Sequence, residues 1–151
     1  MPDDICTDCW RKRQRRYSVI DIFPEVFDAL YNLVIAQYPN ANINNELILE
    51  PESFPCVCIE EISNAVDTNT VDSGSNERHV NLDYEITVYS NALYERRSEC
   101  RTILKIIDDY LVGVKGFMRI MARPVDMDDG TKSRLIARYT CTTDGKYIYR
   151  R

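Results

Sequence analysis

The stretch that decides the fold is residues 80–88, which read VNLDYEITV. The even-numbered residues from Val80 to Val88 are apolar or aromatic, and the odd-numbered residues between them are polar. Successive side chains of a β-strand point to opposite faces, so this alternation predicts a strand with one buried and one polar face. Such a strand is typical of an antiparallel sheet that is covered on a single side.

Two amphipathic helices are predicted on either side of this strand. The first covers residues 22–37, where Asp21 can cap the helix and Pro24 lies in the first turn. The second covers residues 91–112 and is expected to end at Gly113 and Gly116. In both segments apolar residues recur at three- and four-residue steps, which places them on one face of a helix; they are Phe23, Val26, Phe27, Leu30, Leu33 and Val34, then Cys100, Ile103, Leu104, Ile107 and Leu111.

Further strands are predicted at residues 56–63, 117–125 and 132–143, with a short one in the tail at 146–151. The pair Asp129-Gly130 is a strong turn signal and predicts a hairpin around residues 126–131. Residues 40–45 are expected to form a turn, residues 50–55 a rigid extended loop and residues 64–78 a mobile surface loop.

The element order α-β-β-α-β-β predicts an α+β fold. It has a mainly antiparallel sheet of about four strands, with two helices packed on one face. A length of 151 residues fits one domain, assigned to residues 21–151. Residues 1–20 are expected to form a flexible basic arm, because residues 11–16 contain five of the chain's cations.

Charge and composition exclude several classes of protein. The hydrophobic fraction is 44%, and the 5 Gly and 6 Pro are too few for collagen-like or low-complexity chains. The net charge is −5, so the chain outside the basic run carries −10 and repels phosphate, which argues against a folded nucleic-acid reader. An acidic opening predicts no secretory signal, and the longest aliphatic run, 33–36, predicts no membrane span.

The six cysteines are expected to be thiols. Cys6 and Cys9 have the spacing of half a zinc knuckle, but Cys56 and Cys58 fit a strand interior better than a second knuckle. Cys100, like Cys141, falls on an apolar stripe and is assigned to the core. We therefore expect no metal and no cofactor.

Catalytic patterns are weak. His79 is the only histidine, and a single loop histidine is more often incidental than catalytic. Glu60 and Glu61 would point to opposite faces of a strand and could not share a proton. There is no glycine-rich phosphate loop, and the chain is expected not to be an enzyme.

Five phrases together resemble the tail terminator proteins of long-tailed bacteriophages and prophages. They are residues 51–57 PESFPCV, 82–91 LDYEITVYSN, 98–100 SEC, 134–139 RLIARY and 148–151 IYRR. The resemblance covers residues 23–151, whereas the first twenty residues depart from the family pattern. It implies a small α+β protein that forms a ring, usually of six copies, on the head-proximal end of the tail tube. Such a ring stops tube polymerisation and presents a surface for the head connector.

The resemblance also implies the partners and the location. The partners would be further copies of the chain, the tail tube protein and the head-tail connector protein, with DNA passing through the lumen without specific binding. The protein would lie in the neck of the virion tail after assembly in the bacterial cytoplasm.

Candidate interface residues come from the long loop, the hairpin turn and the tail, where aromatic and arginine side chains favour interfaces. They are Asp72, Asn76, Arg78, Asp128, Asp129, Tyr147, Tyr149, Arg150 and Arg151. Three alternatives stay open: a head-side connector or stopper ring, a small nucleic-acid-binding regulator that uses the basic arm and Trp10, and a zinc-dependent module.

Overall fold

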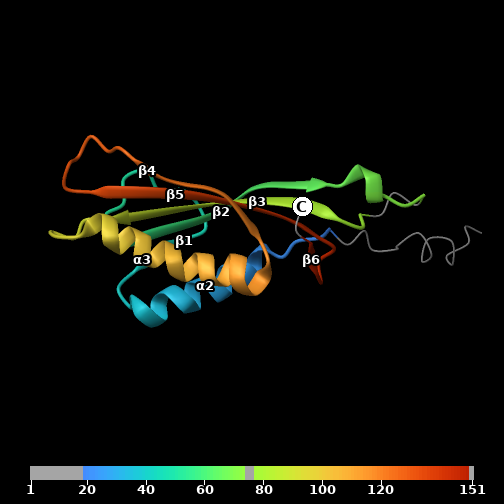
Figure 1. Ribbon diagram of the computed structural model, residues 1–151, viewed down its shortest axis with the longest axis horizontal. Coiled ribbons are helices and arrows are strands. Elements are labelled where there is room, and N and C mark those ends of the chain that lie inside the picture. Colours follow the sequence, from blue (N-terminus) through green and yellow to red (C-terminus); the bar gives the residue numbers. More distant parts are fainter. Residues whose placement is uncertain (1–18, 74–76, 150–151) are drawn as a thin grey trace, which may run out of the picture.

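A computed structural model describes residues 19–73 and 77–149. The basic run, Cys6, Cys9, Trp10, Asn76, Arg150 and Arg151 lie outside these described residues. The elements in chain order are α2 (Phe23–Gln37), β1 (Asn42–Asn44), β2 (Cys56–Val66), the 3-10 turn η1 (Thr68–Thr70), β3 (Val80–Ser90), α3 (Arg96–Asp108), the π-helical turn η2 (Asp109–Lys115), β4 (Met118–Val125), β5 (Ser133–Thr143) and β6 (Ile148–Tyr149) (Figure 1).

The predicted α+β class is confirmed. The strands form one sheet in the order β1-β2-β3-β5-β4, with β6 paired to β5. All pairs are antiparallel except β1 and β2, which run parallel. Both helices lie on the same face of this sheet (Figure 1). The expected count of about four strands was too low, because the sheet has six.

The core lies between β3 and the two helices. The even-numbered side chains of β3 are fully buried, as the alternation predicts. They pack with Val26, Leu30 and Val34 of α2 and with Ile103 and Ile107 of α3 in one hydrophobic cluster. Cys100 and Cys141 are buried in the same cluster, which confirms their assignment to the core.

A second, smaller cluster covers part of the opposite face of the sheet. Cys56, Cys58 and Tyr89 are buried there beneath the loop between β1 and β2. Leu47 and Phe54 of that loop pack against them. This confirms that the cysteines lie on one strand face as small buried side chains.

Four boundaries differ from the prediction. Residues 42–44, expected in a turn, form β1, because the Asn42 amide donates to the Pro55 carbonyl at 2.9 Å and sets up a parallel pairing. β2 continues to Val66, which pairs with Val80, so the loop predicted at 64–78 is shorter. η1 lies within that loop.

The second helix also differs from its predicted bounds. It begins at Arg96 and not at residue 91, because Glu95 has a φ of 61°, in the left-handed region that interrupts a helix. At its other end, Gly113 lies inside the π-helical turn η2, and Gly116, with a φ of 90°, ends that turn.

Candidate interaction surfaces

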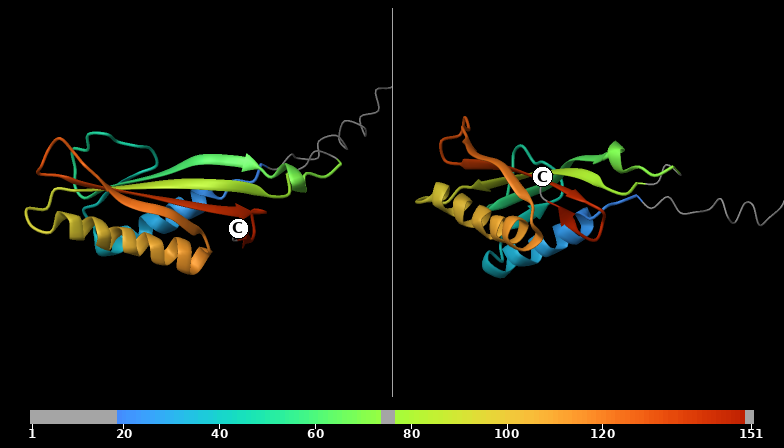
Figure 2. Two further views of the ribbon diagram at one scale, coloured as in Figure 1. Left: turned by 45° about the horizontal axis from the view of Figure 1, so that its top comes forward. Right: turned by 45° about the vertical axis from the view of Figure 1, so that its right-hand side comes forward.

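Those predicted interface residues that the structure describes lie toward two opposite ends of an elongated molecule (Figure 1). β3 has 11 residues, which at about 3.3 Å each span about 35 Å. The β4–β5 turn and the start of α3 lie at one end, and β6 lies toward the other (Figure 2). We name the two ends by described residues: the β6 end contains Asp67, Asp72, Arg78, Asp144, Lys146, Tyr147 and Tyr149; the α3 end contains Leu93, Tyr94, Arg96, Arg97, Arg101, Asp128, Asp129 and Lys132.

At the β6 end, Asp144 organises the turn between β5 and β6. Its carboxylate accepts hydrogen bonds from the backbone amides of Tyr147 at 2.7 Å and Lys146 at 2.8 Å, and from the Tyr149 hydroxyl at 3.1 Å. The Tyr147 amide first, and then the Lys146 amide, lower the pKa of Asp144 below its ordinary value. Tyr147 itself is 56% exposed, with the Lys146 ammonium 5.2 Å from its ring centre.

The same end joins segments that are distant in sequence. The His79 ring packs edge-on against Tyr149, with centroids 5.5 Å apart. The Arg78 guanidinium lies 3.7 Å from an oxygen of Asp72. The Ile20 amide donates to Glu77 at 3.2 Å, so the start of the described chain is anchored here. The predicted residues Asp72, Arg78, Tyr147 and Tyr149 therefore share one surface.

The α3 end exposes a pair of large apolar side chains that sequence analysis missed. Leu93 is 87% exposed and Tyr94 is 86% exposed, in the turn between β3 and α3. The next residue, Glu95, has a positive φ and makes no side-chain cap to the helix. Two adjacent apolar residues at the start of the helical pattern could have indicated this surface. They were instead included in the helix predicted at residues 91–112.

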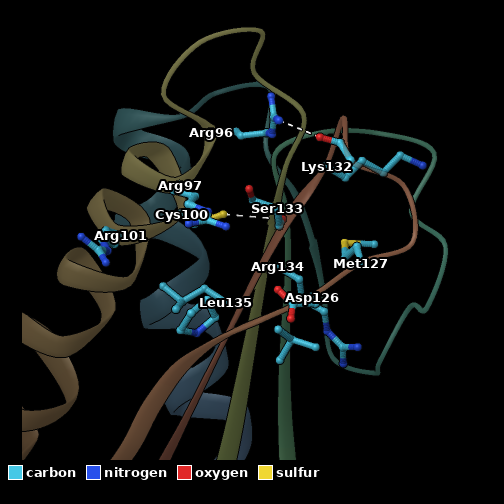
Figure 3. Close-up of a pocket in the computed structure, with 13 residues that line it drawn as sticks. Arg96, Arg97, Cys100, Arg101, Asp126, Met127, Lys132, Ser133, Arg134 and Leu135 are labelled. Atoms are coloured by element: carbon cyan, nitrogen blue, oxygen red, sulfur yellow. Dashed lines mark hydrogen bonds between the residues drawn. The ribbon is translucent and has the colours of Figure 1, made fainter.

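A cavity of about 190 Å³ lies between α3 and the β4–β5 hairpin (Figure 3). Its cationic lining residues are Arg96, Arg97, Arg101, Lys132 and Arg134, and Asp126 also lines it. A guanidinium nitrogen of Arg96 donates to the Gly130 carbonyl at 2.6 Å and ties the helix to the turn. In the part of the chain that the structure describes, Arg97 and Arg101 make no hydrogen bond or ion pair.

The hairpin turn at the α3 end holds the predicted residues Asp128 and Asp129. Asp129 accepts hydrogen bonds from the Thr131 hydroxyl at 2.6 Å and the Thr131 amide at 2.9 Å. These bonds lower the pKa of the Asp129 carboxyl. Lys132 lies 3.4 Å from the same side chain, so Asp129 shapes the turn, whereas Asp128 is exposed beside it.

The acidic and cysteine side chains of residues 19–73 and 77–149 are spread over the sheet, the helices and the turns. No group of three or more His, Cys, Asp or Glu side chains in those residues could hold a metal ion. The Cys56 and Cys58 sulfurs are 4.0 Å apart and buried. Glu60 pairs opposite Glu85 and Glu61 opposite the core residue Tyr84, so the two acids face opposite sides of the sheet.

Among residues 19–73 and 77–149, no helix combines the length and the apolar composition that are needed to cross a bilayer.

The fold resembles that of a chain in a solved virus-like particle. No protein-family model and no curated protein matches the sequence. One similar solved structure is a chain of "Virion of native gene transfer agent (GTA) particle", with a TM-score of 0.53 and 15% sequence identity. The likeness covers 74% of this chain and 88% of that chain. At this identity it establishes a shared fold.

Proposed function

We propose that this chain is a structural subunit of a phage-type virion. In this role it forms a ring that caps the head-proximal end of the tail tube, ends tube polymerisation and provides the head-tail joining surface. The observation that carries the proposal is the fold shared with a virion chain over 88% of that chain's length. The tail-terminator phrases within residues 51–151 point in the same direction.

The distribution of interaction residues supports a ring. A closed ring needs a heterologous contact, in which one surface of a subunit meets a different surface of its neighbour. The α3 end and the β6 end are two different surfaces about 35 Å apart, each with exposed apolar side chains and charged groups.

Strand addition does not suit this assembly. β4 is the long edge strand, and it contains Pro124 and a register shift between Arg119 and Met121. Prolines, bulges and charges on an edge strand discourage pairing with another strand. Subunit contacts through the two ends are therefore favoured over continuation of the sheet.

The acidic balance of the chain suits a ring through which DNA slides. The part of the chain outside residues 11–16 carries −10 charges, and a lumen of like charge keeps phosphates from adhering. Neutralising the lumen acids is expected to slow DNA ejection. Unchanged ejection would remove this argument.

Negative-stain microscopy of the purified protein with and without tail tubes tests the proposal. We expect rings on one end of each tube and a halt in tube growth. Rings that bind only the head-side connector would favour a stopper ring. A protein that stays monomeric and ignores tube ends would contradict both functions.

A further inference from the structure

We propose that the α3 end binds the β6 end of a second copy of this chain, with the arginine-lined cavity as the centre of the contact. This inference rests on the proposed ring and assigns the two surfaces that form its subunit interface. The cavity is the cationic half, and the exposed Leu93 and Tyr94 directly precede α3, whose first residues, Arg96 and Arg97, line the cavity.

The two arginines in the first turn of α3 do not stabilise the helix at that position. Arg96 and Arg97 occupy the first turn of α3, where the helix dipole is positive and acidic residues are stabilising. Arg97 and Arg101 find no hydrogen bond or ion pair in the described chain. Because neither guanidinium has a bonded partner among the described residues, both are suited to an acidic group from outside.

The β6 end carries the complementary chemistry. Asp144 accepts a hydrogen bond from the amide of the exposed Tyr147, and Asp67 and Asp72 flank η1 and the exposed Val71 at the same end. Arg78 and Lys146 are the described cations of this end, and Arg78 faces Asp72. Acids next to an aromatic and an aliphatic side chain match cations next to Leu93 and Tyr94, charge against charge and apolar against apolar.

Nucleic acid would be a second occupant for an arginine-lined surface. The exposed Leu93 and Tyr94 pair suits an apolar partner surface better than a phosphate backbone, and the acidic remainder of the chain repels phosphate. A second copy satisfies both the charged and the apolar parts of the surface. Because the two halves lie at opposite ends, the contact repeats from subunit to subunit.

The experiment uses two full-length variants that each damage one end. Variant one carries Arg97→Glu and Arg101→Glu; variant two carries Asp72→Lys and Tyr147→Lys. Sedimentation at about 50 mM salt is expected to show assemblies of the wild-type protein, and each variant alone is expected to weaken association by about 100-fold or more, because like charges then meet. Association of the wild type is also expected to weaken as salt shortens the Debye length.

Mixing the two variants gives the decisive readout. Each keeps the surface that the other lacks, so the mixture is expected to recover association through one intact contact per pair. A symmetric contact between identical surfaces would leave one of the two variants associating as strongly as the wild type on its own, and that result would overturn the inference. Lys105→Glu, one turn further along α3 and outside the cavity, is the matched control and is expected to change association by less than about twofold.

Other outcomes also decide the question. Circular dichroism checks that both variants fold, and Arg97→Glu is expected to raise the melting temperature of the monomer because an acid in the first turn favours the helix dipole. Wild-type protein that stays monomeric at low salt, or that retains duplex DNA through the α3 end, would overturn the inference.

The capping role is tested separately, on the ends of tail tubes. Rings that still form with variant one would reject this interface and leave the proposed function standing.

Discussion

At the scale of single residues, Tyr139 connects the sheet to the end of α3. Its hydroxyl donates to one oxygen of Asp108, and the other oxygen accepts from Arg119 at 2.5 Å. Burial first, and then the Asp108 hydrogen bond, raise the pKa of Tyr139. Tyr139→Phe removes one hydrogen bond and is expected to lower the free energy of unfolding by about 1 kcal/mol in urea titrations. Tyr31→Phe, at an exposed position of α2, is the control, and equal losses for both variants would contradict the argument.

Asp144 makes the β6 end sensitive to acid. Its pKa is lowered from 3.8 in the folded chain because the Tyr147 and Lys146 amides donate to the ionised form. The stabilisation is therefore complete above the unfolded pKa and is lost as the pH falls through the lower, folded pKa. The Lys146 and Tyr147 amide NMR signals are expected to stay constant from neutral pH to about pH 4 and to shift below it. A midpoint above the ordinary value of an aspartate would show that the turn does not hold the carboxylate.

At the scale of elements, two glycines near the end of α3 are expected to respond oppositely to alanine. Gly116 has a φ of 90° and no atom within 4 Å of an added Cβ, so the cost of Gly116→Ala is that of the backbone alone, about 1 kcal/mol. Gly113 lies within η2 without a positive φ and has the same open space. Gly113→Ala is expected to stabilise the chain by about 0.5–1 kcal/mol. Thermal unfolding of both variants tests the pair, and a change of the same sign in each would show that packing governs this turn.

The elements that the sequence predicted are those whose pattern is local. The alternation in β3 and the helical spacing in α2 indicate which side is buried. The predicted face of β3 is buried, although Thr87 and Tyr89 of its other face are buried too, and in α2 the predicted stripe residue Leu33 is 39% exposed. β1 was missed because its three residues, Asn-Ile-Asn, are too few for a strand pattern to stand out, and its pairing depends on residues 56–58 in another element. The start of α3 was misplaced because the left-handed residue before it is Glu95, so the sequence offers no glycine to signal the break.

The interaction surfaces were predictable only in part, because residues distant in the sequence come together only in the folded chain. Tyr147 and Tyr149 could be proposed from residue type alone. The cavity could not, because Arg97 on α3 and Lys132 after the hairpin turn are neighbours only once the chain folds. Asn76, Arg150 and Arg151 lie outside the described residues and stay predictions.

At the scale of the whole molecule, the carboxyl-terminal tail has a folding role and a surface role that must be separated. β6 pairs with β5, the Thr143 hydroxyl donates to the Tyr147 carbonyl at 2.7 Å, and Ile148 packs against the core. Truncation after Asp144 removes all three interactions. If the truncated protein formed no rings, the cause could be a destabilised fold or a lost subunit contact, and the experiment would not separate the two. Tyr147→Ser keeps the backbone pairing and changes a side chain that is 56% exposed. It is expected to alter the free energy of unfolding by less than about 0.5 kcal/mol.

Tail tubes assembled with the Tyr147→Ser protein test the surface role directly. If the β6 end meets a neighbouring subunit, fewer tubes are expected to carry a ring, and the distribution of tube lengths in electron micrographs broadens, because uncapped ends continue to grow. Tyr31→Ser, which changes another partly exposed tyrosine on α2, is the matched control and is expected to leave tube lengths unchanged. Tyr147→Ser protein that caps tubes as well as the control does would remove the tail from the interface, and it would move the search for the acidic half of the contact to Asp67 and Asp72.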